Sequence, residues 1–319
     1  MGITVNNDTI IYDTTSQTFY LERLKDVLEV FNQSSAGAIK LRTEAIAGDF
    51  DKSTVYKIGG ELEIRDVNST ETVTEKKIGM AESVGVKVSW KYGPYSATEE
   101  SFKRRGRSID EFNKIVGQDV ADATLSGFIK HAFVSLDAAI SSNPDMVVTA
   151  SFATDHKKVL TKGLRKLGDR SNDVVIFAMD STTYSDLVDD AIDQKIFNET
   201  GYVIYGGLPG TMGKPVLVSD KILPNKIFGL QAGAIEVVES QAPGFRSYPI
   251  NNAENLAIGY RAEGTFNIKM LGYSWNTNGA PPAPANPTTA QLGSGANWYK
   301  YALDNKSTAG VVINLTQQP

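Results

Sequence analysis

The chain has 319 residues, of which 41% are hydrophobic and 22% charged, so it has an ordinary globular composition and can bury a sizeable core. It contains no cysteine, which excludes disulfides, thiolate metal sites and thiol nucleophiles. Its formal net charge of −5 argues against a protein that grips nucleic acid by neutralising phosphates.

The N-terminal region predicts an arm. Its first residues lack a basic segment followed by an apolar run, so no signal peptide is expected. No apolar stretch in the chain approaches the roughly 20 residues that span a bilayer, so we expect a soluble, cytoplasmic protein. Residues 1–19 are polar without a clear period, and Leu21, Leu24, Leu28 and Phe31 then recur at helical spacing. This pattern predicts an extended arm that carries one short helix.

From about residue 48 to 96, polar and apolar residues alternate at a period of two, which is typical of half-buried strands. The alternating runs are Val55–Ile58, Glu61–Val67, Thr72–Ile78 and Ser83–Trp90, with a turn at Asn68–Thr70. They predict a long two-stranded hairpin. A hairpin alone cannot stabilise itself, so it must lie on something else, for example a neighbouring subunit.

The strongest helical signal follows this hairpin. Ser108–Glu111 forms a capping box, and apolar residues then recur three or four positions apart from Ile109 to Ile140. The run Ser141–Pro144 ends the pattern. About 33 residues at ~1.5 Å each predict a helix roughly 50 Å long.

The next segment alternates helices and strands. A second helix is predicted over about Asp155–Leu167, and Val174–Met179 is an apolar, β-branched run typical of a buried strand. Helix-capping residues begin at Asp180 and precede a further helical pattern to Ile192. A glycine-rich loop at residues 201–213 then leads into a strand.

That loop ends in Gly213-Lys214-Pro215, which superficially resembles a phosphate-binding loop. Such a loop needs a glycine five residues before the Gly-Lys pair and a Ser or Thr after the lysine, whereas this chain has Leu208 and Pro215. Pro215 also disfavours the helical conformation at Lys214. No helix N-terminus is therefore expected there to hold an anion.

The rest of the chain predicts strands and a tail. Strand-like runs occupy residues 226–230, 234–239, 256–261 and 264–270. Residues 279–287 are too rich in proline for a helix or a central strand and predict a polyproline-like linker before the C-terminal tail.

The order strand, helix, glycine-rich loop and Gly213-Lys214-Pro215-Val216-Leu217-Val218-Ser219-Asp220 resembles the major capsid proteins of tailed double-stranded DNA bacteriophages, with the HK97-like fold. Asn286-Pro287-Thr288 and Asn297-Trp298 are also similar to segments of some phage capsid proteins. No single residue is diagnostic, and the order of five elements over about residues 20–275 carries the resemblance.

The resemblance implies an α+β fold with an N-terminal arm, an extended β-hairpin called the E-loop, a peripheral domain with a long spine helix, and an axial domain. The implied boundaries are 1–47 for the arm, 48–100 for the hairpin, 101–149 and 236–275 for the peripheral domain, 150–235 for the axial domain, and 276–319 for the linker and tail.

The implied function is structural and not enzymatic, with no cofactor and no metal. Many copies would form pentamers and hexamers of an icosahedral shell that encloses packaged DNA without sequence-specific binding. The shell would assemble in the host bacterial cytoplasm and become part of the virion. A neutral to acidic inner wall would avoid adhesion to DNA.

Expected partners are other copies of the chain, a portal protein and, in some members of the family, a decoration protein. A separate scaffolding protein is also implied, because only about 100 residues precede the spine helix and most belong to the hairpin. Some members join subunits by a Lys–Asn isopeptide bond. Lys52, Lys57, Lys76 and Lys77 lie in or beside the hairpin, but exposed lysines are ordinary there.

Residues with suitable charge or backbone freedom are candidates for inter-subunit contacts. They are Arg104, Arg105 and Arg107 before the spine helix, Arg65, Lys76 and Lys77 on the hairpin, and Gly207 and Gly210 in the glycine-rich loop. A second basic run, at residues 157–166, lacks the interleaved aromatic residues that stack on bases. Both basic runs therefore favour contact with acidic neighbours.

Two other functions stay open. An encapsulin-like compartment would keep the fold and enclose enzymes in place of DNA. A cytosolic hydrolase would use Asp155 and His156 or a divalent cation on the acidic helix. Against it, adjacent residues on a helix point in different directions, and His131 is expected to be solvated or at an interface. The acidic residues Asp186, Asp189, Asp190 and Asp193 are best interpreted as a solvated face.

Overall fold

The computed structural model describes residues 7–57, 59–60, 62–105, 109–156, 158–193, 213–250 and 254–316. The helices are α1 Asn7–Ser34, α2 Glu99–Arg105, α3 Ile109–Ser141, α4 Phe152–Asp155, α5 Lys158–Arg165, α6 Ser181–Asp193 and α7 Thr289–Leu292. The strands are β1 Ile39–Thr43, β2 Phe50–Lys57, β3 Gly79–Thr98, β4 Val147–Ala150, β5 Val174–Met179, β6 Val216–Val218, β7 Lys226–Gln231, β8 Ile235–Ile250, β9 Ala257–Met270, β10 Tyr273–Trp275, β11 Trp298–Lys300 and β12 Gly310–Leu315.

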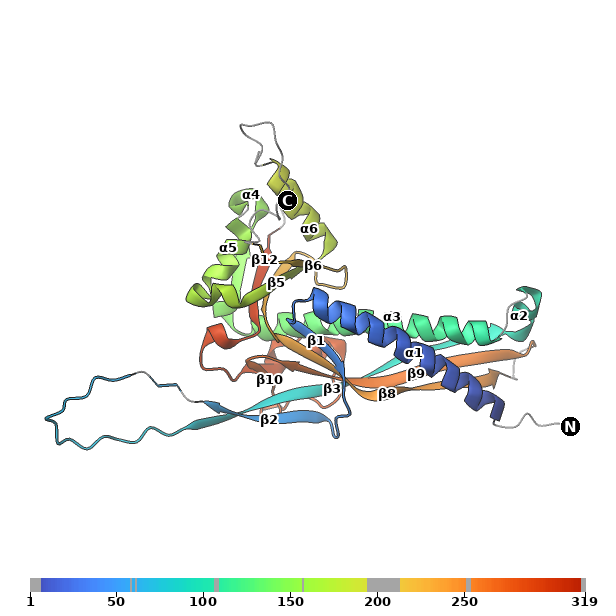
Figure 1. Cartoon of the computed structure of the whole chain (residues 1–319), viewed down its shortest axis with the longest axis horizontal. Coiled ribbons are helices and arrows are strands. Elements are labelled where there is room, and N and C mark those ends of the chain that lie inside the picture. The colour runs from blue at the N-terminus through green and yellow to red at the C-terminus, as the bar shows by residue number, and fades with distance from the viewer. Residues whose placement is uncertain are drawn as a thin grey trace.

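The strands form two sheets. The larger follows the order β1-β8-β9-β10-β11, with β3 pairing β9 and β2 pairing β3. The smaller follows the order β4-β12-β7-β5-β6. In Figure 1 the long strands of the larger sheet run along the base of the molecule, and the smaller sheet stands above it with α4, α5 and α6.

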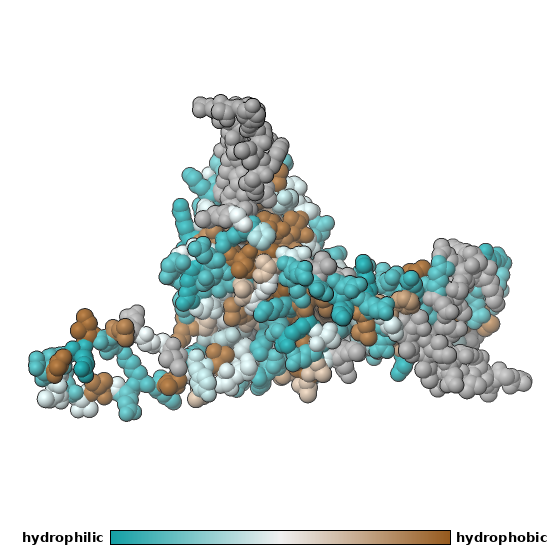
Figure 2. Space-filling view, in the orientation of Figure 1, coloured by the Kyte–Doolittle hydropathy of each residue, from teal (hydrophilic) through white to brown (hydrophobic). Residues whose placement is uncertain are grey.

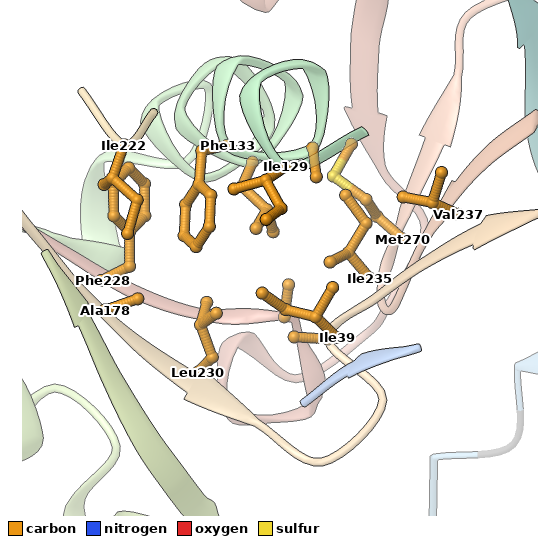
Figure 3. Packing of buried hydrophobic residues seen from close by; sticks show 14 of the residues in the cluster. Ile39, Ile129, Phe133, Ala178, Ile222, Phe228, Leu230, Ile235, Val237 and Met270 are labelled. Carbon is orange, nitrogen blue, oxygen red and sulfur yellow. The ribbon is translucent and has the colours of Figure 1, made fainter. Parts of the chain in front are cut away.

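The long helix α3 joins the two sheets into one core. Ile129 and Phe133 of α3 face Phe228 and Leu230 of the smaller sheet and Ile235 and Met270 of the larger one (Figure 3). The rings of Phe133 and Phe228 meet edge to face with centroids 5.2 Å apart. Burying these side chains stabilises the fold by about 1.5–3 kcal/mol each. The long helix predicted from the capping box at Ser108 and the apolar period up to Ile140 is confirmed as α3.

Helix α1 lies beside α3 and packs on the larger sheet (Figure 1). Leu24, Leu28 and Phe31 are buried, as their spacing predicts, but the helix begins at Asn7, well before the predicted start. The prediction of an extended arm over residues 1–19 is therefore wrong for residues 7–19. Tertiary packing explains the difference, because Tyr20 is fully buried and Ser16 Oγ donates to the Asn113 carbonyl of α3 over 3.2 Å.

In the part of the hairpin that the structure describes, the strands pair only near the base. Its strands β2 and β3 pair from Phe50↔Val86 to Lys57↔Gly79. The predicted strands Glu61–Val67 and Thr72–Ile78 do not form in the described part of the loop, although a turn closes there with the Ser69 amide bonded to the Asp66 carbonyl. Alternation alone failed here because no surface among the described residues covers the apolar side of these runs.

Three other predictions need correction. The helix expected over 155–167 is shorter, Lys158–Arg165 (α5), and a separate helix α4 ends at Asp155, followed by His156 at a positive φ of 50°. The runs 256–261 and 264–270 are one strand, β9, which continues through Gly264 because the Trp90 indole lies directly over that position. The C-terminal segment contributes β12, which lies between β4 and β7 in the smaller sheet, so its residues 310–315 are core and not a free tail.

Candidate inter-subunit surfaces

The hairpin is the most exposed part of the described chain. Its base is fixed to the larger sheet, where Lys269 Nζ donates to Asp51 Oδ2 over 3.2 Å and to Ser53 Oγ over 3.0 Å. Beyond Lys57 the loop extends away from the body, at the left of Figure 1. It therefore has a firm attachment and an unsupported tip.

Large apolar side chains on this segment face solvent. Leu62 and Ile64 are as exposed as in an isolated peptide, at 104% and 102%, although they alternate with the charged Glu63 and Arg65. Figure 2 shows these apolar groups (brown) spaced among hydrophilic ones along the loop. The exposed set is Tyr56, Leu62, Ile64, Val67, Val73, Ile78 and Met80. Such a gathering of exposed apolar residues marks an interaction surface.

The charged residues of the hairpin lie on the same exposed surface. Lys76 Nζ meets Glu63 Oε1 at 2.5 Å, and Lys52 Nζ lies 3.9 Å from Glu82 Oε2. Arg65 and Lys77 are exposed. Exposed ion pairs contribute little to stability, so these residues are available for contacts outside the chain.

The basic cluster before α3 is only partly described. Arg104 Nε lies 3.0 Å from Glu100 Oε1 one helical turn earlier on α2, and both side chains are largely exposed. The side chain of Arg105 and the whole of Arg107 lie outside the described residues, as do Gly207 and Gly210. The predicted contacts of these four residues stay predictions.

The basic and acidic helices carry their charges outward. Lys158, Arg165 and Lys166 at α5 are exposed, and Asp186 and Asp189 on α6 are exposed. In the described residues, no three His, Cys, Asp or Glu side chains gather in a way that could hold a metal ion. A calcium site on α6 gains no support from the described geometry.

The residues proposed for hydrolysis serve local structure. Asp155 accepts from Lys162 Nζ at 2.5 Å and from the Ser151 amide at 3.2 Å. The hydrogen bond from Lys162 lowers the pKa of this carboxyl group below its ordinary value. Asp155 ends α4 and His156 turns the chain with its positive φ. Both residues thus shape the corner between two helices.

Lys214 also has a structural role. Its Nζ donates to the carbonyl of Val174 and, over 3.4 Å, to that of Asn172. Burial lowers the pKa of this amine below its ordinary value. The residues after it enter β6, which pairs in parallel with β5. The lysine therefore supports the strand beside it, and the residues after Pro215 form a strand as predicted.

Several structural contacts were missed by the sequence reasoning. Tyr20 of α1 donates to the buried carboxylate of Glu239 on β8. The C-terminal region packs through Trp275 and Trp298, whose rings meet edge to face at 4.8 Å. Thr288 and Gln291 form a complete capping box on α7, a signal present in the sequence but not used.

Among the described residues, no helix has the length and hydrophobicity of a membrane span.

Comparison with known proteins identifies relatives by sequence profile and by fold. The profile of the Gp13-like family, described as "Major capsid protein 13-like", matches residues 8–312. No curated protein sequence matches significantly.

The fold is similar to several solved phage structures. That of Microbacterium phage Oxtober96 superposes with a TM-score of 0.54 and 10% identity, covering 89% of this chain and 91% of the other. The capsid of cyanophage P-SCSP1u gives 0.51 and 12% identity, with 89% and 88% covered. The mature capsid of bacteriophage PhiM1 gives 0.51 and 10%, with 89% and 87% covered. These similarities confirm the predicted HK97-like α+β fold.

Proposed function

The chain belongs to the Gp13-like family of major capsid proteins, and on this premise we propose that its copies tile an icosahedral phage head as pentamers and hexamers. The protein is a structural component of the virion and not an enzyme. Its copies assemble into the head shell. What remains to be assigned is how the copies meet and which other proteins take part.

The observation that carries the proposal is the exposed apolar set on the hairpin. A single copy leaves Leu62 and Ile64 fully in water, and no described part of the same chain covers them. Each such side chain gains about 1.5–3 kcal/mol when it is buried. A neighbouring copy would supply the missing surface, and the open loop would then gain the cross-strand order that its alternating sequence favours.

Charged residues would fix the register of these contacts. We assign this role to Arg65, Lys76 and Lys77 on the hairpin and to the cluster Arg104, Arg105 and Arg107. Complementary charges steer association and exclude wrong alignments more than they add affinity. The loop with Gly207 and Gly210 would lie near the centre of a capsomer, where glycine permits close approach of backbones.

The proposed domain boundaries and partners follow from the family resemblance. The arm, hairpin, peripheral domain and axial domain would take the boundaries given above, with residues 310–315 of the tail assigned to the axial sheet through β12. A separate scaffolding protein would guide assembly, a portal protein would occupy one vertex, and a decoration protein is an optional addition. DNA would be enclosed without sequence-specific contacts.

Negative-stain electron microscopy of the purified full chain, alone and with its scaffolding protein, tests the proposal. Rings, tubes or closed shells are expected for the wild type. The double variant Leu62→Ser, Ile64→Ser should stay unassembled yet fold normally, while the exposed loop control Glu71→Ser should assemble. Normal shells from the double variant would contradict the role of the hairpin, and monodisperse wild-type monomers in both preparations would contradict shell assembly itself.

The encapsulin-like alternative differs in contents and not in fold. Mass spectrometry of purified shells from infected or expressing cells distinguishes the two, since co-purified enzyme would favour a compartment. The family membership of the chain favours the phage head.

A further inference from the structure

An exposed leucine lies at the neck of the hairpin, where β2 and β3 leave the body. Leu303 belongs to the loop between β11 and the short 3-10 helix η4 Asn305–Ser307, and 60% of it is exposed. A Cβ added to Gly59 would lie 3.1 Å from Leu303 Cδ1, so the leucine touches the hairpin two residues beyond the end of β2. The C-terminal loop and the hairpin therefore meet at this point.

The loop that carries Leu303 is fixed on both sides of it. The amides of Tyr301 and Ala302 donate to the Gly272 carbonyl over 3.0 and 3.3 Å, and the Gly272 amide donates to the Tyr301 hydroxyl group over 3.2 Å. After Leu303, the side chain of Asp304 accepts from a backbone amide of η4 over 2.9 Å. Leu303 is thus held in water by an ordered loop, so covering it with a partner needs little further ordering of the backbone.

The neck itself adds exposed apolar side chains. Tyr56 of β2 pairs directly with Met80 of β3, so the two side chains project from the same face of the hairpin. Both are largely exposed, and so is Ile78 just before β3. A single exposed leucine on a surface would need no explanation. Beside this group, however, Leu303 continues the exposed apolar set of the hairpin onto the body of the protein.

Charged residues near the neck occur in pairs of opposite sign. Lys52 Nζ lies 3.9 Å from Glu82 Oε2, and Arg170 Nη1 lies 3.9 Å from Asp304 Oδ2. Paired charges give little attraction for a polyanion such as DNA. Apolar side chains with a polar rim are instead the usual composition of a contact between proteins. Because copies of this chain assemble into the head shell, a second copy is the partner that fits.

We propose that Leu303 is an anchor residue of the contact between copies and that an apolar surface of a second copy covers it together with Tyr56 and Met80. This inference rests on the proposed shell and extends its contacts from the hairpin to the body. The tip of the hairpin projects away from the body, whereas Leu303 is fixed to it. A contact at the neck would therefore hold the second copy against the body, which a contact at the tip alone would not do.

Thiol labelling tests whether assembly covers this position. The chain has no cysteine, so the variant Leu303→Cys carries a single thiol. This thiol should react readily with a charged maleimide in the unassembled protein and at least about tenfold more slowly in purified shells. Ala290→Cys, at an exposed position of α7, is the matched control for access of the reagent to shells. If assembly slows both thiols equally or slows neither, Leu303 is not covered by a second copy and the proposal is overturned.

Substitutions test whether the covered side chain drives assembly. Leu303→Ser should leave thermal unfolding of the unassembled protein nearly unchanged, because the side chain is largely exposed. It should raise the protein concentration needed for assembly about tenfold or more, the factor expected when a contact loses a buried leucine. Leu303→Met keeps an apolar side chain of similar volume and should assemble at the wild-type concentration.

The outcomes separate this inference from the proposed shell itself. Assembly of Leu303→Ser at the wild-type concentration would reject the anchor and leave the shell intact. Wild-type protein that forms no shells would reject both the shell and the anchor.

Discussion

The hydroxyl group of Tyr20 donates a hydrogen bond of 2.5 Å to Oε1 of Glu239 in the interior of the protein. Tyr20 belongs to α1 and Glu239 to β8, so this bond joins the N-terminal helix to the larger sheet across 219 positions of sequence. Thr43 Oγ1 lies 3.4 Å from the other carboxylate oxygen. The pair anchors α1, which therefore belongs to the folded body.

Replacing Tyr20 by phenylalanine should destabilise the unassembled protein. The change leaves a buried carboxyl group with one weak partner, and losing a hydrogen bond to such a group costs about 1.5–3 kcal/mol. Chemical denaturation of wild type and Tyr20→Phe measures the loss. Tyr56→Phe is the matched control, since Tyr56 is exposed on β2 and its hydroxyl group has water available. Equal stability of Tyr20→Phe and wild type would contradict the anchor.

Glu239 should make stability depend on pH. Burial raises the pKa of its carboxyl group above the ordinary value, and the hydrogen bonds from Tyr20 and Thr43 oppose only part of that rise. Between the unfolded and folded pKa values the native state retains a proton that the unfolded chain has lost. The protonated Glu239 side chain therefore stabilises the fold at low pH. This stabilisation is lost as the pH rises from the unfolded pKa through the folded pKa.

Glu239→Gln removes this titration while keeping groups that can accept from Tyr20. The unfolding free energy of Glu239→Gln, measured in urea at several pH values from 4 to 8, should not show the decline with rising pH that the wild type shows. Tyr20→Phe should widen the window, because the Tyr20 hydrogen bond lowers the pKa of Glu239. Parallel pH profiles for wild type and Glu239→Gln would refute the assignment.

Two glycines of the spine helix should respond oppositely to alanine. A Cβ on Gly117 would lie 2.6 Å from the Ser16 carbonyl oxygen of α1, whereas one on Gly127 would meet nothing within 4 Å. Gly117→Ala should push α1 away and lower the melting temperature. Gly127→Ala should gain up to about 1 kcal/mol of helix propensity, equivalent to roughly 2 °C. Thermal unfolding of both variants checks the contrast, and a shift of the same sign in both would contradict it.

The elements that the sequence predicted well are those whose side chains pack within the chain. The apolar period of α3 and the β-branched run of β5 face the core, so local pattern and tertiary environment agree. The runs around Leu62 and Val73 have equally clear alternation but form no strand in the described residues, where no other part of the chain covers their apolar side chains. The alternation there predicts which side chains are apolar but not the local backbone structure.

Other features could not be read from the sequence because they depend on distant contacts. Val311 to Ile313 form an apolar run that fits a strand, but only its position between β4 and β7 shows that the C-terminus completes the smaller sheet. The ring contact between Phe128 of α3 and Phe266 of β9 joins residues 138 positions apart in the chain. The proline-rich segment likewise gains its order by contact, since Trp275 Nε1 donates to the Pro284 carbonyl over 3.1 Å.

The packing of β12 under α5 gives a test of its place in the core. A Cβ on Gly163 of α5 would lie 2.7 Å from Cδ1 of the buried Ile313. Gly163→Ala should therefore cost about 1–3 kcal/mol through overpacking, and Ile313→Val, which removes that methyl group, about 0.5–1.5 kcal/mol. The double variant should lose about 1 kcal/mol less unfolding free energy than the two single variants lose in total. Strict additivity in urea unfolding would contradict this contact.

The basic cluster before the spine helix should matter for assembly and not for folding. Arg104 is exposed and pairs with Glu100 on the same helix, an interaction worth about 0.3–0.5 kcal/mol. Reversing Arg104, Arg105 and Arg107 to glutamate should therefore leave thermal unfolding of the monomer nearly unchanged. If these residues meet acidic groups of a neighbour, the same change introduces like-charge contacts that cost several kcal/mol at each interface and should prevent closed shells.

Electron microscopy and sedimentation of the triple variant measure this effect. The variant Lys158→Glu, Arg165→Glu, Lys166→Glu, at the two ends of α5, is the matched control, since it makes the same change in net charge on another exposed surface. Loss of shells in the first variant alone would locate the contact before α3. Loss in both would indicate a general sensitivity to net charge, and normal shells from the first would exclude the cluster as an inter-subunit contact.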